Sequence, residues 1–204
     1  GLDPLFVTPG LRGYEDPNGV KAEEVKHEDI EIKTKDSDKK EIIKVRFSYL
    51  HPKFVWEDGK RNENTLRWKT LSAHRGLIVS RNGRQIDILT NLRGKNKLDY
   101  NLQPYDQYWK CEIDFPATLD EDFSITTSKQ QITMSDRIWE ALRNRGVGKT
   151  MRAGYNLAAD RFDEIKQESE TDPDKPRPSE EIAAAVKALT EKPTDELVTR
   201  RKRA

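Results

Sequence analysis

The most constraining feature of this sequence is a strict alternation of apolar and charged side chains over residues 108–115. The apolar members are Trp109, Cys111, Ile113 and Phe115, and the charged members are Lys110, Glu112 and Asp114. A period of two residues is typical of a β-strand with one buried face and one face in water. Pro116 follows and brings no N–H to a ladder, so the strand is predicted to end there.

Two hairpins are predicted upstream of this strand. Residues 29–33 and 41–50 are predicted strands joined by a polar turn, and apolar side chains occupy every second position from Ile43 to Tyr49. In residues 76–89, GLIVSRNGRQIDIL, the pair Asn82-Gly83 separates two strand-like runs. Both positions of a two-residue hairpin turn need positive φ, which this pair tolerates. Residues 51–75 show no clear period and are predicted to be loop, with room for one short helix.

Two helices are predicted after the strand. The first covers about residues 136–144, with Ser135 as its N-cap. The second starts near Lys149 and carries an apolar stripe on one side. The members of the stripe are Met151, Tyr155, Ala158, Phe162 and Ile165. We expect this stripe to pack across the sheet or against a partner.

The distribution of proline, glycine and charged residues divides the chain into three parts. Residues 1–27 are rich in proline and glycine, which favours an extended connector that Leu5, Phe6 and Val7 could anchor to a neighbour. Residues 28–166 hold the strands and helices of one domain. Residues 167–204 are predicted to be a flexible, partly disordered tail with short helices. Because the chain starts at Gly1 and stops in a basic run just behind a helix start, we expect a fragment of a longer protein.

Composition argues against several classes of protein. The 204 residues carry a formal net charge of +1, which argues against a whole-molecule field that collects nucleic acid or anionic lipid. No apolar run approaches the ~20 residues that a membrane span needs, and no signal-peptide pattern opens the chain. The single cysteine, Cys111, excludes an internal disulfide and fits a small buried hydrophobe in a reducing compartment. We therefore expect a cytoplasmic protein without a membrane partner.

Several patterns look like sites but have simpler explanations. Residues 146–150, GVGKT, lack the upstream glycine and the preceding strand of a phosphate-binding loop, so a glycine break between two helices explains them. His27, His51 and His74 have no metal-type spacing, and no metal site is predicted. The acidic run 120–122 is predicted to be a solvated turn. The closing basic run is predicted to be a solvated helix face or a chain end.

One loop remains as a candidate site. Between the strand and the first helix, residues 126–131 form an uninterrupted polar patch around Lys129. An ammonium group beside hydroxyl and amide donors suits the oxygens of a phosphate. The residues alone favour an ordinary exposed lysine. Two other interpretations stay open: a nucleic-acid surface at Arg93, Lys95 and Lys97 with the basic terminus, and a protein partner on the apolar stripe.

A resemblance to a known family favours the phosphate-binding interpretation of Lys129 over an ordinary exposed lysine. Residues 76–89 and 108–142 resemble the segment that follows the ATP-binding domain in the GHKL ATPases, the superfamily of DNA gyrase B, MutL, MORC and the histidine kinases. Residues 3–15, DPLFVTPGLRGYE, resemble the connector of bacterial MORC- and MutL-type proteins, so the likeness covers about residues 3–165. It implies an α+β fold of the ribosomal-S-five-like transducer type, a mixed sheet with helices packed on it.

The same resemblance implies a role for the polar loop. In that family a lysine of the second domain reaches the γ-phosphate of ATP held in the first, and it falls on Lys129 here, flanked by Ser128 and Gln130. These residues would sense the triphosphate and favour a closed homodimer. ATP and Mg²⁺ would be bound mainly by an upstream domain of the same chain.

The signatures of that upstream domain are absent from this sequence. Glu140 and Asn144 match its E-x-x-x-N pattern by spacing alone and follow the lysine loop instead of preceding it. The fragment by itself is therefore expected neither to bind ATP tightly nor to hydrolyse it. The process that such an ATPase would drive, whether DNA handling, chaperoning or defence, stays open, as does a DNA or protein client.

Overall fold

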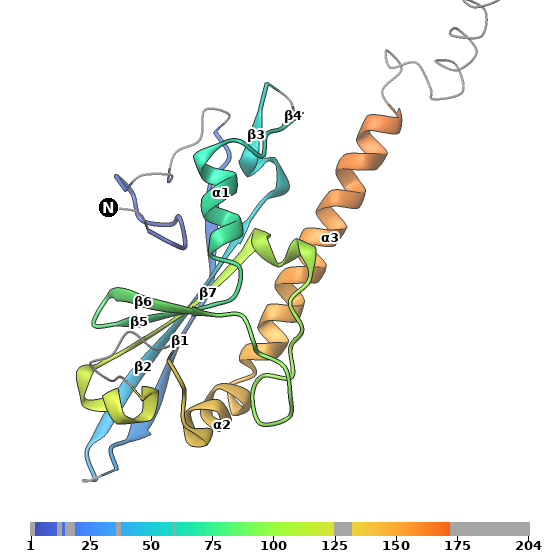
Figure 1. Cartoon of the computed structure of the whole chain (residues 1–204). Helices are drawn as coiled ribbons and strands as arrows, with labels where there is room; N and C mark the ends of the chain where they lie inside the picture. The colour runs from blue at the N-terminus through green and yellow to red at the C-terminus, as the bar shows by residue number, and fades with distance from the viewer. Residues whose placement is uncertain are drawn as a thin grey trace, which may run out of the picture. The chain divides into compact units, whose positions relative to one another are not determined.

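A mixed sheet of five strands, in the order β1-β2-β7-β5-β6, forms the centre of the fold (Figure 1). The computed structural model describes residues 3–11, 14, 19–35, 38–58, 60–124 and 132–171. The strands are β1 (Ala22–Lys33), β2 (Lys40–Leu50), β5 (Leu77–Arg81), β6 (Arg84–Leu89) and β7 (Trp109–Phe115). β5 and β7 are parallel, and the other neighbours are antiparallel. The predicted α+β class with a mixed sheet is confirmed.

Helices and short turns complete the fold. The helices are α1 (Leu66–Ala73), α2 (Asp136–Asn144) and α3 (Val147–Thr171), and the 3₁₀ turns are η1 (Pro52–Val55), η2 (Pro104–Tyr108) and η3 (Ala117–Phe123). A small hairpin pairs β3 (Trp56–Glu57) with β4 (Lys60–Arg61). The chain divides into two units, residues 1–162 and 163–204, and the packing described below is that of the first. Among the described residues, no helix has the length and apolar character of a membrane span.

Both predicted hairpins are present. β1 pairs with β2, and β5 pairs with β6 across the turn at Asn82 and Gly83. These two residues have φ of 50° and 76°, the two positive values that the turn requires. β1 begins at Ala22, so the last part of the predicted connector 1–27 belongs to the sheet. The predicted helix 136–144 is α2, and the second helix starts at Val147, close to its predicted start.

The apolar face of the predicted strand lies in the main hydrophobic core. α2 and the first part of α3 cover this face of the sheet (Figure 1). Residues of this core include Ile43, Val45 and Phe47 of β2, Cys111, Ile113 and Phe115 of β7, and Ile138, Leu142 and Met151 of the helices. The alternation in β2 and β7 therefore predicts the buried face correctly, because every second side chain of a strand points to the same side.

The apolar stripe of α3 packs within the chain as far as Phe162. Met151 and Ala158 are fully buried. Phe162 stacks on Tyr105 with ring centroids 4.7 Å apart and meets Tyr108 edge-on at 5.0 Å. The hypothesis that this stripe docks a partner protein therefore loses its basis over this length.

The other face of the sheet is covered as well, which corrects the prediction that the charged side of residues 108–115 lies in water. Lys110 and Glu112 are 0% and 8% exposed. α1 and the N-terminal segment lie over this face (Figure 1). The hydroxyl of Ser48 in β2 donates to the carbonyl oxygen of Leu5 in the N-terminal segment over 2.9 Å. The fold therefore has three layers around β7.

A second, smaller core explains this cover. It contains Phe6 of the N-terminal segment, Phe54 of η1 and Leu71 of α1, together with Leu50 at the end of β2. The rings of Phe6 and Phe54 meet edge-on with centroids 5.4 Å apart. Residues 51–75, predicted to be mostly loop, thus form packed structure, because their few apolar side chains find partners from distant segments.

Gly148 provides a test of how closely α3 approaches the rest of the chain. A Cβ atom at this position would lie 2.7 Å from the carbonyl oxygen of Leu98. A glycine-to-alanine change within a helix ordinarily stabilises by about 1 kcal/mol. Here the new methyl group overlaps a backbone atom, so we expect Gly148→Ala to lower the free energy of unfolding by about 1–3 kcal/mol in urea. Asn156→Ala, exposed on the same helix, is the control, and a stabilised Gly148→Ala protein would contradict this packing.

Candidate functional site

The residues predicted to contact phosphate, Lys129, Ser128 and Gln130, lie outside the described residues, within the segment 125–131. The structure describes both ends of the loop that carries them. One end leaves η3 at Ser124, and the other returns at Ile132 ahead of α2. The described part of the candidate site is therefore the base of this loop.

Asp122 closes the base of the loop. Its carbonyl oxygen accepts the N–H of Ser135 over 2.7 Å, and its carboxylate accepts the hydroxyl of Ser135 over 2.9 Å. Arg137, in the first turn of α2, donates to both carboxylate oxygens, with its Nε 2.7 Å from Oδ1. The Nζ of Lys35 lies 3.7 Å from Oδ1. Residues 122 and 135, which are 13 positions apart in the sequence, are therefore held side by side.

This geometry has an electrostatic consequence. The hydrogen bond from Arg137 holds the pKa of Asp122 below its ordinary value, and Ser135 and Lys35 act in the same direction. The carboxylate is therefore ionised at neutral pH, where its charge-assisted bonds are strongest. Ser135 precedes α2 as predicted but makes no side-chain capping bond, because its hydroxyl donates to Asp122 instead.

The turn η3, which leads into the loop, is also held by an arginine at the end of β5. The Nε and Nη2 atoms of Arg81, at the end of β5, each lie 2.7 Å from an oxygen of Asp120. Phe115 and Phe123 stack with ring centroids 3.6 Å apart. The prediction of a solvated acidic turn is wrong for Asp122, whose side chain is 3% exposed. The arginines that bind Asp120 and Asp122 lie in other elements of the fold, so the acidic run in the sequence did not indicate that these carboxylates are paired.

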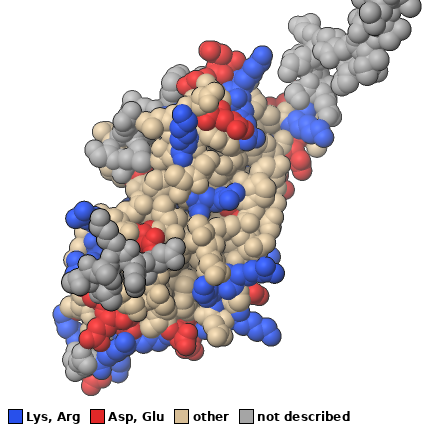
Figure 2. Space-filling model, in the orientation of Figure 1, with Lys and Arg blue, Asp and Glu red and all other residues tan. Residues whose placement is uncertain are grey.

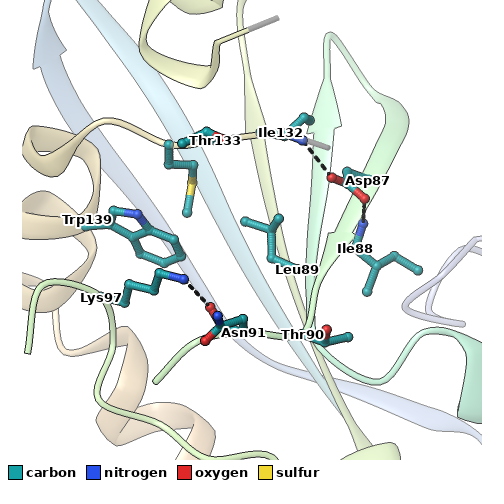
Figure 3. A pocket seen from close by; sticks show the side chains of 10 residues that line it. Asp87, Ile88, Leu89, Thr90, Asn91, Lys97, Ile132, Thr133 and Trp139 are labelled. Atoms are coloured by element: carbon teal, nitrogen blue, oxygen red, sulfur yellow. Dashed lines mark hydrogen bonds between the residues drawn. The ribbon is translucent and has the colours of Figure 1, made fainter. Parts of the chain in front are cut away.

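The far end of the loop is tied to the edge strand β6 by one carboxylate. The N–H of Ile132 donates to Oδ2 of Asp87 over 3.0 Å, and Oδ1 accepts the N–H of Ile88 over 2.7 Å (Figure 3). Asp87 therefore joins β6 to the segment that returns from the loop. Sequence reasoning missed this residue, since its partner is a backbone N–H 45 positions away.

A groove of about 240 Å³ lies beside this tie. Residues 87–91 form one wall, and residues 132–134 with Trp139 and Lys97 form the other (Figure 3). The Nζ of Lys97 donates to the carbonyl oxygen of Asn91 over 2.9 Å and lies 5.9 Å from the centre of the Trp139 ring. The groove thus combines apolar side chains with one ammonium group.

Lys110 is a buried cation on the covered face of β7. Its Nζ donates to the carbonyl oxygens of Leu71 and His74, over 2.8 and 3.3 Å. These oxygens lie at the C-terminal end of α1, where a positive charge is favoured by the helix dipole. Burial lowers the pKa of Lys110 to about 7, and the charge of Arg75 acts in the same direction. The lysine therefore joins α1 to the sheet.

Its neighbours on β7 are also satisfied within the sheet. Glu112 accepts the hydroxyl of Ser80 over 2.6 Å and lies 3.4 Å from Arg46. Burial raises the pKa of Glu112, while Ser80 and Arg46 oppose that shift. Cys111 is fully buried, as predicted for a small hydrophobe, and burial raises the pKa of its thiol well above the ordinary value.

The GVGKT segment is a break between helices, as predicted. Gly146 has φ of 72° and follows α2, and Gly148 lies in the first turn of α3. The described residues contain no group of three or more histidine, cysteine or acidic side chains that could hold a metal ion. His51 caps η1, and His74 bonds to Thr70 and Gln85, so both histidines have local structural roles.

The basic loop after β6 is partly available to a ligand. Arg93 and Lys95 are exposed, whereas Lys97 is half-buried against Trp139. Lys and Arg side chains gather at the lower right of Figure 2, over α2 and this loop. The basic run 200–203 and the short tail helix predicted ahead of it lie outside the described residues. The nucleic-acid hypothesis therefore keeps two exposed cations.

Comparisons with protein-family models, with curated proteins and with solved structures find no match for this chain. The resemblance to the GHKL transducer segment consequently depends on the residues quoted for it.

The tie at Asp122 can be measured through stability. Asp122→Asn keeps the shape of the side chain and removes its charge, so we expect the free energy of unfolding at neutral pH to fall by about 1.5–3 kcal/mol. Because the native pKa of Asp122 is depressed, its contribution is present above the ordinary value of 3.8 and is lost as pH falls through the native pKa. The difference from wild type should shrink on acidification. Asp160→Asn, exposed on α3, is the control, and a pH-independent difference would contradict this role.

The buried Lys110 predicts a dependence on pH in a higher window, between its folded pKa of about 7 and its ordinary value of 10.5. Its pKa is about 7 in the folded chain against an ordinary 10.5, so the unfolded state binds more protons between these values. The stability of wild type should therefore rise with pH across this window, by at most about 1.4 kcal/mol per pH unit, relative to Lys110→Met. Urea unfolding of both proteins at a series of pH values measures the difference.

Lys69→Met, which removes an exposed lysine of α1, is the matched control and should show no such trend. A constant difference between wild type and Lys110→Met from about pH 7 to 10.5 would mean that Lys110 keeps its proton in the folded chain.

Proposed function

We propose that this chain is the transducer part of a GHKL-type ATPase, with a ribosomal-S-five-like fold. In this proposal Lys129 contacts the γ-phosphate of ATP held by an upstream domain of the same chain, and Ser128 and Gln130 supply neighbouring donors. The nucleotide state is relayed to homodimerisation or to a DNA or protein client. The assembly acts in the cytoplasm.

The observation that best supports this proposal is the closed base of the Lys129 loop. Asp122 binds Ser135 at the base of the loop, and Asp87 binds the N–H of Ile132, where the chain returns from the loop. A loop with a fixed base presents a side chain at a lower entropic cost than a free segment does. Both ties depend on carboxylates that accept backbone N–H or arginine donors, which are strong interactions at neutral pH.

The chemistry required of this chain is small. Phosphoryl transfer spreads negative charge over the phosphate oxygens, and a positioned cation stabilises that charge. A lysine ammonium is a compact charge with three donors, so one side chain can serve both sensing and stabilisation. Mg²⁺ and the rest of ATP would be held by residues upstream, and the part of this chain is to place one cation.

The test is steady-state ATP hydrolysis by the parent protein that includes the upstream domain. Lys129→Ala should lower kcat/KM at least tenfold, which corresponds to about 1.4 kcal/mol of lost transition-state stabilisation. Lys95→Ala removes an exposed lysine of another loop and should leave hydrolysis unchanged. The present chain alone should hydrolyse no ATP.

A second readout separates sensing from folding. Lys129→Ala should unfold in urea like wild type, while ATP no longer shifts the parent protein to a dimer in sedimentation. Wild-type hydrolysis by Lys129→Ala would reduce Lys129 to a surface lysine and would contradict the proposal.

The alternative is a non-catalytic nucleic-acid-binding module, which the exposed Arg93 and Lys95 favour. Binding to phosphates releases counterions, so the affinity for DNA would fall steeply with salt. Charge reversal at Arg93 and Lys95 would abolish this binding, whereas Lys129→Ala would leave it unchanged. That pattern, with no effect of Lys129 on hydrolysis, would place the alternative first.

A further inference from the structure

β6 forms one edge of the sheet, and among the described residues no strand pairs with its outer side. We propose that this edge, with the adjoining groove, binds an extended peptide of a partner protein, which adds to the sheet as a further strand. The main chain of an edge strand presents unpaired N–H and C=O groups that such a peptide can satisfy. This inference does not depend on the proposed ATPase function.

The two edges of the sheet differ in their protection. Seven of the twelve residues of β1 are Lys, Asp or Glu, a composition that discourages pairing with another chain. β6, RQIDIL, has two charged residues among six, and three of its residues are apolar. Ile86 is 40% exposed at this edge. The charge of Asp87 is occupied by the N–H groups of Ile88 and Ile132. Of the two edge strands among the described residues, β1 is therefore protected by its charges, and β6 lacks this protection.

The groove gives the incoming strand room and a recognisable lining. Asp87 holds Ile132 beside β6, so residues 132–134 form a wall that faces residues 87–91 (Figure 3). The groove has a volume of about 240 Å³, and its lining includes the apolar side chains of Leu89, Met134 and Trp139. Successive side chains of an extended peptide alternate in direction, so apolar residues at every second position would face this lining.

The charge at one end of the groove specifies the partner further. Lys97 lines the groove, and its Nζ uses one donor on the carbonyl oxygen of Asn91. An ammonium has three donors, so it can also bind a carboxylate. Among the described residues Lys97 contacts the carbonyl oxygen of Asn91 and the ring of Trp139, and no carboxylate is paired with it. The peptide should therefore carry an acidic residue at the end that lies beside Lys97.

The probe is a fluorescein-labelled peptide, Glu-Val-Thr-Val-Thr-Val-Glu, titrated with the whole chain and followed by anisotropy. We expect saturable binding below about 1 mM, and weakening of at least ~tenfold by Ile86→Lys, because a charge on the edge opposes strand addition. Ile42→Lys is the matched control, since Ile42 is a similarly exposed isoleucine on β2, 45% exposed. It should bind like wild type.

A charge swap tests the acidic end of the peptide. Lys97→Glu should lose the glutamate-ended peptide and gain affinity for the same peptide ended by lysines. Lys95→Glu, in the same loop but outside the groove lining, should not reverse the preference. Amide exchange of β6 should slow when the glutamate-ended peptide binds.

Three results would overturn the proposal. The first is binding that Ile86→Lys and Ile42→Lys weaken equally, which would mean that β6 is not the site. The second is protection, in the chain alone and without peptide binding, of the β6 amides that do not bond to β5, because the outer edge would then already be covered. The third is an oligothymidine that binds in a Lys97-dependent way while the peptide does not, which would assign the groove to nucleic acid.

Discussion

The burial of β7 on both faces is the constraint on which the rest of the structure depends. The strand lies between β2 and β5. α2 and the first part of α3 cover one face, and α1 with the N-terminal segment covers the other. A charged side chain in such a place needs internal partners, because an unsatisfied buried group costs several kcal/mol. Lys110 finds them at the end of α1, and Glu112 finds Ser80 and Arg46. The position of α1 is thus tied to one lysine of the central strand.

At the base of the Lys129 loop, charged side chains are also paired with donors from distant segments. Asp122 and Asp87 are carboxylates whose partners come from α2 and from the returning chain. Each carboxylate holds two segments together beyond the ends of the strands. Residues 132–134, which follow the loop in the sequence, form a wall of the groove along β6. A ligand at either place would therefore act on the same short segment.

Local periodicity predicted much of the sheet. The turn at Asn82 and Gly83 and the bounds of α2 follow from neighbouring residues, because positive φ and the periodicity of apolar side chains are local properties. The exposed side assigned to residues 108–115 was wrong, since alternation shows that a strand has two different faces but not what covers the second one. The acidic turn at Asp122 was misjudged for a similar reason, because the arginine that binds it lies in another element.

By itself the sequence determined the strands and turns of the two hairpins, the break at Gly146 and the burial of Cys111. Each of these depends on side chains a few positions apart, whose contributions are the same in any fold. Only the tertiary structure decided that Lys110 and Glu112 are interior groups, that Asp87 and Asp122 tie the loop, and that β6 is an edge strand of the described sheet. Those properties depend on which distant segments meet, and a charged residue shows its partner only when the chain has brought the two together.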